Sequence, residues 1–169
     1  RNIEALEKVQ PEDLPPASIE PRLGAGWIPA LDVEACIREV LVLKNCDVGY
    51  PAQAGAWSIR YQVYAAPQNV KVTQEFGTSR MNAIELVQCA LNVQVPTVRD
   101  RDPVTDRYFV NSDETLAARE KLGLIKERFA RWAFDDTERR EKLCRIYNDL
   151  FNATRPRRFD GSHLKLPGF

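Results

Sequence analysis

Basic side chains gather in the last third of the chain, and their chemistry suits them to bind phosphate groups. Residues 119–169 hold 13 Lys and Arg against 8 Asp and Glu, whereas residues 1–118 hold 11 against 16. Guanidinium groups pair well with phosphates, and several together give salt-dependent, sequence-independent affinity for nucleic acid. The candidates lie on two predicted helices and in the tail beyond them: Lys121, Arg128, Arg131, Arg139, Arg140, Arg155, Arg157, Arg158 and Lys165. The alternative is a solvated helical face whose interspersed glutamates neutralise the same charges.

A second candidate phosphate site precedes a predicted helix over residues 80–91. Gly77 punctuates the chain there, and the next residues supply two hydroxyls and a guanidinium: Thr78, Ser79 and Arg80. Free backbone N–H groups at a helix N-terminus attract anions, so these residues could hold a phosphate. Simple capping of the helix by Thr78 or Ser79 explains them equally well.

The residue patterns of common catalytic sites are missing. The sequence has no GxxxxGK[ST] phosphate loop and no GxGxxG, GxSxG or HExxH motif. The single histidine, His163, lies in the tail near Asp160, but residues this close along an extended chain usually point apart. Acidic pairs such as Asp135 and Asp136 stand in turns or at helix starts, where they act as caps. We therefore expect no catalytic residue and no cofactor in this chain.

The cysteines do not form a metal-binding pattern. Cys36, Cys46, Cys89 and Cys144 are scattered, and none lies two to four residues from another. We expect no metal site, and we interpret the four as buried free thiols in a reducing compartment. No run approaches the ~20 apolar residues of a membrane span, and no signal-peptide pattern occurs. The expected protein is soluble and cytoplasmic, with no membrane partner.

Predicted elements give an α+β fold in which a small antiparallel sheet is covered by helices, two of them long and C-terminal. Residues 1–29 hold five of the eleven prolines and form an extended arm that Trp27 and Ile28 anchor to the core. The core domain is expected over residues 30–154, and residues 155–169 form an extended tail leading to a following domain.

Within the core, periodicity predicts a helix over 31–43 capped by Asp32 and a strand over 57–64 paired with a second strand over 70–76. A hairpin is expected from a strand over 93–98 and another beginning at 107–110. The long helices are predicted over 114–134, with Asp113 as cap, and over 137–152, with Asp135 or Asp136 as cap. Their core stripes are Leu122, Ile125, Phe129 and Trp132 in the first, and Leu143, Ile146, Tyr147, Leu150 and Phe151 in the second.

Several stretches resemble one protein family. They are PEDLPPASIEPRLGAGWIP (11–29), the W-S-I strand at 57–59, FGTSRMNA (76–83), VNSDETLAAREK (110–121) and, most closely, residues 129–169. These stretches resemble the segment between the two enzymatic halves of large phage- and plasmid-borne proteins. Such proteins join an adenine-specific DNA methyltransferase to a Swi/Snf-like helicase.

The resemblance implies a parent protein that methylates DNA and hydrolyses ATP, using S-adenosylmethionine and ATP. The motifs of both active sites are absent from this chain. What the resemblance leaves for it is contact with duplex DNA, coupling of the neighbouring methyltransferase and helicase domains, or both. The alternative is a structural spacer that packs against those domains without touching DNA. A standalone enzyme is the third and least favoured hypothesis.

Overall fold

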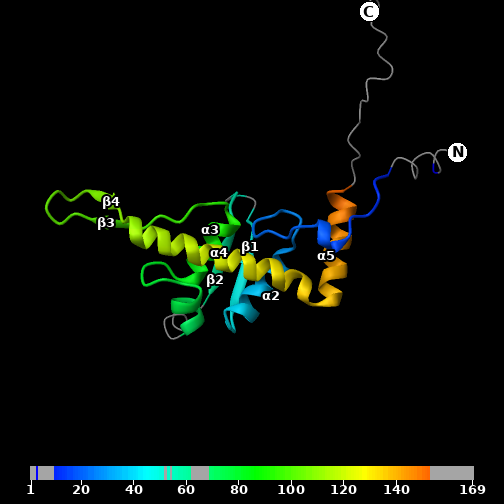
Figure 1. Cartoon of the computed structure of the whole chain (residues 1–169), viewed down its shortest axis with the longest axis horizontal. Coiled ribbons are helices and arrows are strands. Elements are labelled where there is room, and N and C mark those ends of the chain that lie inside the picture. Colours follow the sequence, from blue (N-terminus) through cyan, green and yellow to red (C-terminus); the bar gives the residue numbers. More distant parts are fainter. Residues whose placement is uncertain (1–2, 4–9, 52, 54, 62–68, 153–169) are drawn as a thin grey trace, which may run out of the picture.

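The fold combines helices with two small antiparallel sheets, which confirms the predicted α+β class (Figure 1). The computed structural model describes residues 3, 10–51, 53, 55–61 and 69–152. The predicted tail over 155–169 and the second half of the predicted strand over 57–64 lie outside these ranges.

The two long helices form as their apolar spacing predicts. Helix α4 spans Ser112–Asp135 and α5 spans Thr137–Leu150. The whole predicted stripe of α4 is buried, and Trp132 is only 2% exposed. In α5 the stripe is buried at Leu143 and fades toward the end of the helix, where Leu150 and Phe151 are exposed. The last turn of α5 therefore extends past the core, against the prediction.

One of the two long helices is capped by a residue other than the predicted one. Helix α4 is capped by Asn111, whose side chain accepts from the Glu114 amide, and not by Asp113. Asp136 caps α5 as predicted, accepting from the Arg139 amide. Several Asn and Asp residues stand near each helix start, and all of them are good caps, so composition alone does not choose among them.

Helix α2 packs against the sheet formed by residues 46–49 and 58–61. It spans Ala30–Val40 and begins after Pro29, so Asp32 is not its cap. Asp32 instead lies in the first turn, where it is buried and accepts two hydrogen bonds from Lys142 Nζ at 2.8 and 2.9 Å. An acidic residue in the first turn also suits the positive end of the helix dipole.

The partner of the strand at residue 58 was predicted wrongly. Strand β2, Ser58–Tyr61, pairs antiparallel with β1, Cys46–Gly49, and no strand was predicted over residues 46–49. Residues 71–75 of the predicted partner form a π-helical turn, Lys71–Glu75. The buried apolar residues of this segment, Val72 in the turn and Phe76 just after it, are four positions apart. That spacing suits a helical turn as well as an alternating strand, and the short segment did not discriminate.

Helix α3 spans Ala83–Leu91 and begins with a capping box. The Asn82 side chain accepts from the amides of Ile84 and Glu85, and the Glu85 side chain accepts from the Asn82 amide at 2.8 Å. The predicted caps, Thr78 and Ser79, lie in the turn before it. Gly77 is required in that turn because a Cβ there would collide with the Val72 carbonyl.

A hairpin projects from the N-terminal end of α4 (Figure 1). Strands β3, Arg99–Arg101, and β4, Tyr108–Val110, pair antiparallel. The prediction of a hairpin is confirmed, but its first strand was placed too early, over 93–98. That segment contains Pro96, which has no N–H to donate to a strand ladder. The first strand forms instead over residues 99–101, in the charged stretch between the two predicted strands.

The segment before α2 packs on the core without forming a long helix. It contains one 3-10 turn, η1 at Pro16–Ser18. Ile19, Leu23, Trp27 and Ile28 are buried, which confirms the predicted anchor at Trp27 and Ile28. Gly24, at a φ of +85°, lets the backbone approach the carbonyl of Leu91 at the end of α3.

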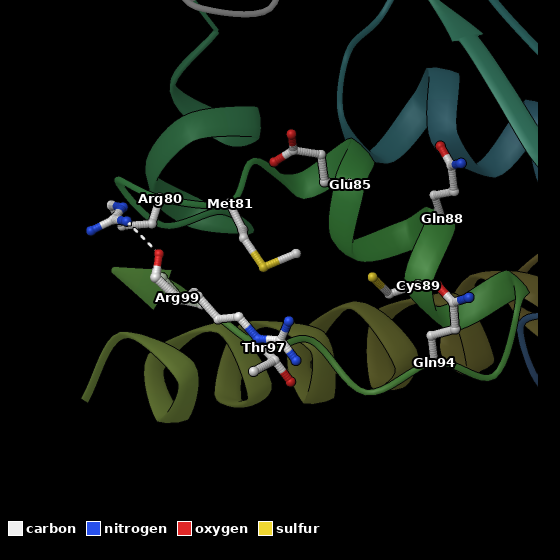
Figure 2. Close-up of a pocket in the computed structure, with 9 residues that line it drawn as sticks. Arg80, Met81, Glu85, Gln88, Cys89, Gln94, Thr97 and Arg99 are labelled. Atoms are coloured by element: carbon white, nitrogen blue, oxygen red, sulfur yellow. Dashed lines mark hydrogen bonds between the residues drawn. The ribbon is translucent and has the colours of Figure 1, made fainter. Parts of the chain in front are cut away.

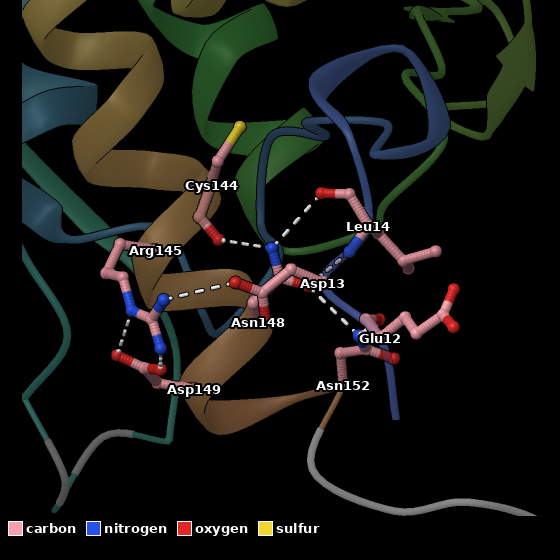
Figure 3. Close-up of polar contacts among 8 residues, drawn as sticks. All are labelled: Glu12, Asp13, Leu14, Cys144, Arg145, Asn148, Asp149 and Asn152. Atoms are coloured by element: carbon pink, nitrogen blue, oxygen red, sulfur yellow. Dashed lines mark hydrogen bonds and ion pairs between the residues drawn. The ribbon is translucent and has the colours of Figure 1, made fainter. Parts of the chain in front are cut away.

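The start of this segment is clasped to the end of α5 (Figure 3). The Leu14 amide donates to Asn148 Oδ1 at 2.8 Å, and Asn148 Nδ2 donates back to the Leu14 carbonyl at 3.1 Å. Asn152 Nδ2 donates to the Glu12 carbonyl at 2.8 Å, and Arg145 pairs with Asp13. Residues 12–14 and 145–152 are therefore held side by side, and the hairpin lies at the opposite end of the molecule (Figure 1).

Candidate nucleic-acid interface

The basic residues predicted on α4 are largely engaged within the protein. Lys121 Nζ donates to the carbonyls of Gln74 and Glu75 at 2.8 and 2.9 Å, and so closes the end of the π-helical turn. Arg128 Nη1 lies 3.6 Å from Asp135 Oδ2. Arg131 lies 3.9 Å from Glu127, but both side chains are about 70% exposed, and such a pair is too weak to withhold Arg131 from a ligand.

Arg139 of α5 is a packing residue in this structure. Its guanidinium carbon lies 3.6 Å from the centre of the Trp132 ring, and its Nη2 donates to the Trp132 carbonyl at 2.6 Å. The indole Nε1 of Trp132 in turn donates to Glu39 Oε2 at 2.7 Å. Within the described residues, the side chain of Arg140, one residue later, makes one hydrogen bond, to the Thr137 hydroxyl at 3.4 Å. The two neighbouring arginines therefore have different roles, which their position in the sequence does not reveal.

The turn at residues 77–80 satisfies much of its own hydrogen bonding. Thr78 Oγ1 accepts from the amides of Arg80 and Met81, and the amides of Ile84 and Glu85 belong to Asn82. Arg80 pairs with Asp100 at 2.6 Å and donates to the Arg99 carbonyl at 3.3 Å. Four of the amides that a phosphate would use at this helix start are thus already bonded. Turn formation accounts for Thr78 here, Asn82 is the cap, and Ser79 is an exposed residue of the turn.

The tail candidates cannot be placed. Arg155, Arg157, Arg158 and Lys165 lie outside the described residues, as does His163.

The hairpin carries basic and aromatic side chains that the prediction assigned no role. Arg99 and Arg107 are exposed and have no carboxylate within 4 Å in the described part of the chain. Beside them in β4, Tyr108 and Phe109 are 69% and 53% exposed. Exposed arginine and aromatic residues that lie on one projecting element are typical of surfaces that bind nucleic acid. The sequence signal was present in residues 99–110, but residues 99–106 were interpreted as a polar turn and residues 107–110 only as a strand of the hairpin.

The base of the hairpin is fixed by Asp100. Its carboxylate accepts from Asn111 Nδ2 at 2.7 Å and pairs with Arg80. The hydrogen bond from Asn111, followed by that from Arg80, holds the pKa of Asp100 below its usual value. Thr115 adds a buried bond, because its hydroxyl accepts from the Val98 amide at 3.0 Å. The base of the hairpin is therefore joined both to the turn before α3 and to the start of α4.

A hollow of about 450 Å³ lies beside the base of the hairpin (Figure 2). Met81, Cys89 and Val98 form its least exposed part. The exposed lining is polar and consists of Arg80, Glu85, Gln88, Gln94, Thr97 and Arg99. Since Arg99 belongs both to this hollow and to β3, the hollow and the hairpin form one continuous surface.

The four cysteines are free thiols. Cys36 and Cys46 are buried as predicted, and Cys89 and Cys144 are only partly so. Burial raises the pKa of Cys36 to about 12 and that of Cys46 to about 11. Within the described ranges, no cluster of three or more His, Cys, Asp or Glu could hold a metal ion. None of the helices in those ranges has the length and apolar character needed to cross a membrane.

Comparison with known proteins identifies one family. The model of a family described as a domain of unknown function, DUF8437, matches residues 22–153. No curated protein and no solved structure matches the chain. The matched range includes both sheets, helices α2 to α5, the hairpin and the hollow.

Proposed function

The chain belongs to the DUF8437 family, and from the geometry of its surfaces we propose that it is a non-catalytic coupling module that contacts DNA. The observation that carries this proposal is the hairpin, where Arg99 and Arg107, which have no carboxylate partner among the described residues, share one short element with exposed Tyr108 and Phe109. Guanidinium groups would bind backbone phosphates there, and the aromatic rings would lie against sugar or base.

The arrangement of the molecule supports the coupling role. The clasp between residues 12–14 and 145–152 holds two distant parts of the chain together at one end. Helix α4, of 24 residues, is roughly 36 Å long at 1.5 Å per residue and carries the hairpin away from that end. A rigid connection between an attachment point and a contact point is what a coupler needs. The resemblance to methyltransferase–helicase proteins makes those two enzymatic domains the proposed neighbours and the cytoplasm the proposed location.

Relative to the sequence-based hypothesis, the proposed contact moves from the helices to the hairpin. Arg80, Lys121, Arg128 and Arg139 make contacts within the protein that a phosphate would have to compete with. Arg131 and Arg140 remain open to a ligand, and Arg155, Arg157, Arg158 and Lys165 stay part of the proposal as residues of the tail. The chemistry of the parent, with S-adenosylmethionine and ATP, is assigned to its other domains.

A spacer without DNA contact is the rival function, and one observation favours it. Several basic residues of α4 and α5 are paired with carboxylates within the chain, as in the pairs of Arg128, Lys142 and Arg145 with Asp residues. The hairpin itself is balanced, with three arginines against three aspartates in residues 99–110. A protein surface could therefore cover it in place of DNA.

Salt-dependent binding to duplex DNA separates the two functions. We expect the full chain to bind a fluorescein-labelled 20-base-pair duplex at about 50 mM salt and much less tightly at about 200 mM. Arg99→Ala combined with Arg107→Ala should flatten the salt slope by roughly 2, about 1 for each lost phosphate contact. Arg157→Ala combined with Arg158→Ala tests the tail in the same way.

The matched control is Arg22→Ala combined with Lys44→Ala, which removes the same charge from outside the hairpin. It should leave the salt slope near that of the unmodified protein. If the unmodified chain shows no affinity for duplex at low salt, DNA contact is excluded and the spacer function is preferred. If the control changes the slope as much as the hairpin pair, binding follows net charge and the hairpin has no special role.

A further inference from the structure

The hollow beside the hairpin has the composition of a ligand site. Its volume of about 450 Å³ lies within the range of small-molecule pockets. The side chains of Met81 and Val98 give it an apolar floor, and Cys89 adds a thiol; Figure 2 shows the Cys89 sulfur turned towards the Met81 side of the hollow. A flat apolar group would be well accommodated on these three side chains.

The polar lining offers hydrogen bonds that the protein does not itself use. Among the contacts of the described chain, the side chains of Gln88, Gln94 and Thr97 have no hydrogen-bond partner, and all three residues are exposed. A glutamine amide supplies both a donor and an acceptor, which is the pair that the edge of a nucleobase requires.

The charges of the hollow limit the ligand further. Arg80 is neutralised by Asp100 at 2.6 Å, and Glu85 contributes a carboxylate. Arg99 remains as the one lining guanidinium without a carboxylate partner among the described residues, and Figure 2 shows its side chain extending towards Thr97. The guanidinium of Arg99 is too little positive charge to balance a polyphosphate. It can balance the one phosphate attached to a neutral ring.

We propose that this hollow binds an unstacked nucleobase of a DNA strand, with Arg99 on the adjacent phosphate. The inference rests on the proposed DNA contact of the hairpin, and it specifies the form of nucleic acid. A base inside a duplex is stacked and paired and cannot enter a pocket unless it is extruded. The chain therefore binds single-stranded DNA more tightly than a duplex of the same length.

Two measurements on the full chain test this site. The first compares the affinities of a labelled 12-nucleotide single strand and the matched duplex at one low salt concentration. We expect the strand to bind more tightly, and we expect Gln88→Ala combined with Gln94→Ala to weaken it about tenfold. Gln74→Ala, which removes an exposed amide from the π-helical turn, is the control and should leave the affinity unchanged.

The second measurement uses the thiol in the hollow as a reporter. Cys89 and Cys144 are both partly exposed, but only Cys89 lines this hollow; Cys144 lines a separate one near Asn148. Saturating single strand should slow alkylation of Cys89 by iodoacetamide several-fold and leave Cys144 unaffected.

The outcomes distinguish the base site in the hollow from the proposed DNA contact of the hairpin. If strand and duplex bind but Cys89 is not protected, or the glutamine pair behaves like Gln74→Ala, the base site is overturned and the hairpin contact stands. Tighter binding of the duplex than of the strand also overturns the base site. If neither nucleic acid binds at low salt, the proposed function itself fails.

Discussion

Arg139 and Arg140 are adjacent in the sequence, yet the structure gives them different surroundings. Arg139 bonds the Trp132 carbonyl and covers the indole ring, whereas Arg140 reaches only the Thr137 hydroxyl. We predict that Arg139→Ala lowers the free energy of unfolding by about 1–3 kcal/mol, because it removes charge-assisted hydrogen bonds and a cation–π contact. Arg140→Ala should stay within about 0.5 kcal/mol. Urea unfolding of both variants checks this, and equal losses would show that Arg139 has no special packing role.

The buried thiol of Cys36 predicts how stability depends on alkaline pH. Burial raises its pKa from 9.0 to about 12 in the folded protein, against the opposing effect of Arg128. At pH values below the pKa of the unfolded chain, the Cys36 thiol is protonated in both the folded and the unfolded state. Its burial then contributes fully to the free energy of unfolding. As pH rises from about 9 through about 12, the unfolded state loses the proton first and is favoured.

The matching experiment compares urea unfolding between pH 7.5 and 11 under reducing conditions. Stability of the unmodified protein should fall more steeply above pH 9 than that of Cys36→Ala. Cys144→Ala, at a thiol that is only partly buried, should follow the unmodified protein more closely. Identical slopes for all three proteins would show that Cys36 does not contribute to this dependence.

At the scale of the element, the start of α3 depends on one asparagine. Asn82 bonds two amides of the first turn, and Glu85 returns a bond to the Asn82 amide. We predict that Asn82→Ala lowers the free energy of unfolding by about 1–2 kcal/mol, as for other lost N-caps. Ser79→Ala, at the residue that the sequence favoured as a cap, is the matched control and should have little effect. A larger loss at Ser79 than at Asn82 would contradict the observed helix start.

At the scale of the whole molecule, Asn148 joins the first described segment to the last helix. It is 9% exposed and exchanges two hydrogen bonds with the backbone of Leu14. We predict that Asn148→Ala releases residues 10–16 from α5 and makes them much more sensitive to limited proteolysis, because a buried amide partner is lost. Asp149→Ala, which removes only an exposed partner of Arg145, is the control. Unchanged cleavage in Asn148→Ala would show that the clasp does not hold this segment.

The sequence by itself determined the elements whose pattern is long and local. The stripe from Leu122 to Trp132 repeats over several helical turns, and a wrong phase would expose four large side chains, so α4 was predictable with its buried face. The hairpin near residues 107–110 and the anchor at Trp27 and Ile28 were predictable from short local patterns, and the cap of α5 was predictable to one of two adjacent residues, Asp135 or Asp136. In each case neighbouring residues contain the signal.

Only the tertiary structure decided the strand pairing and the roles of the arginines. Strand β2 takes its partner from residues 46–49, before it in the chain, and residues 71–75 coil into a turn that contacts α3. Whether Arg139 or Arg140 is available to a ligand depends on which one α5 turns towards Trp132. The hollow is formed by α3, the segment after it and the base of the hairpin. Such contacts join residues far apart in the chain or at neighbouring positions of equal propensity, so local pattern carries no information about them.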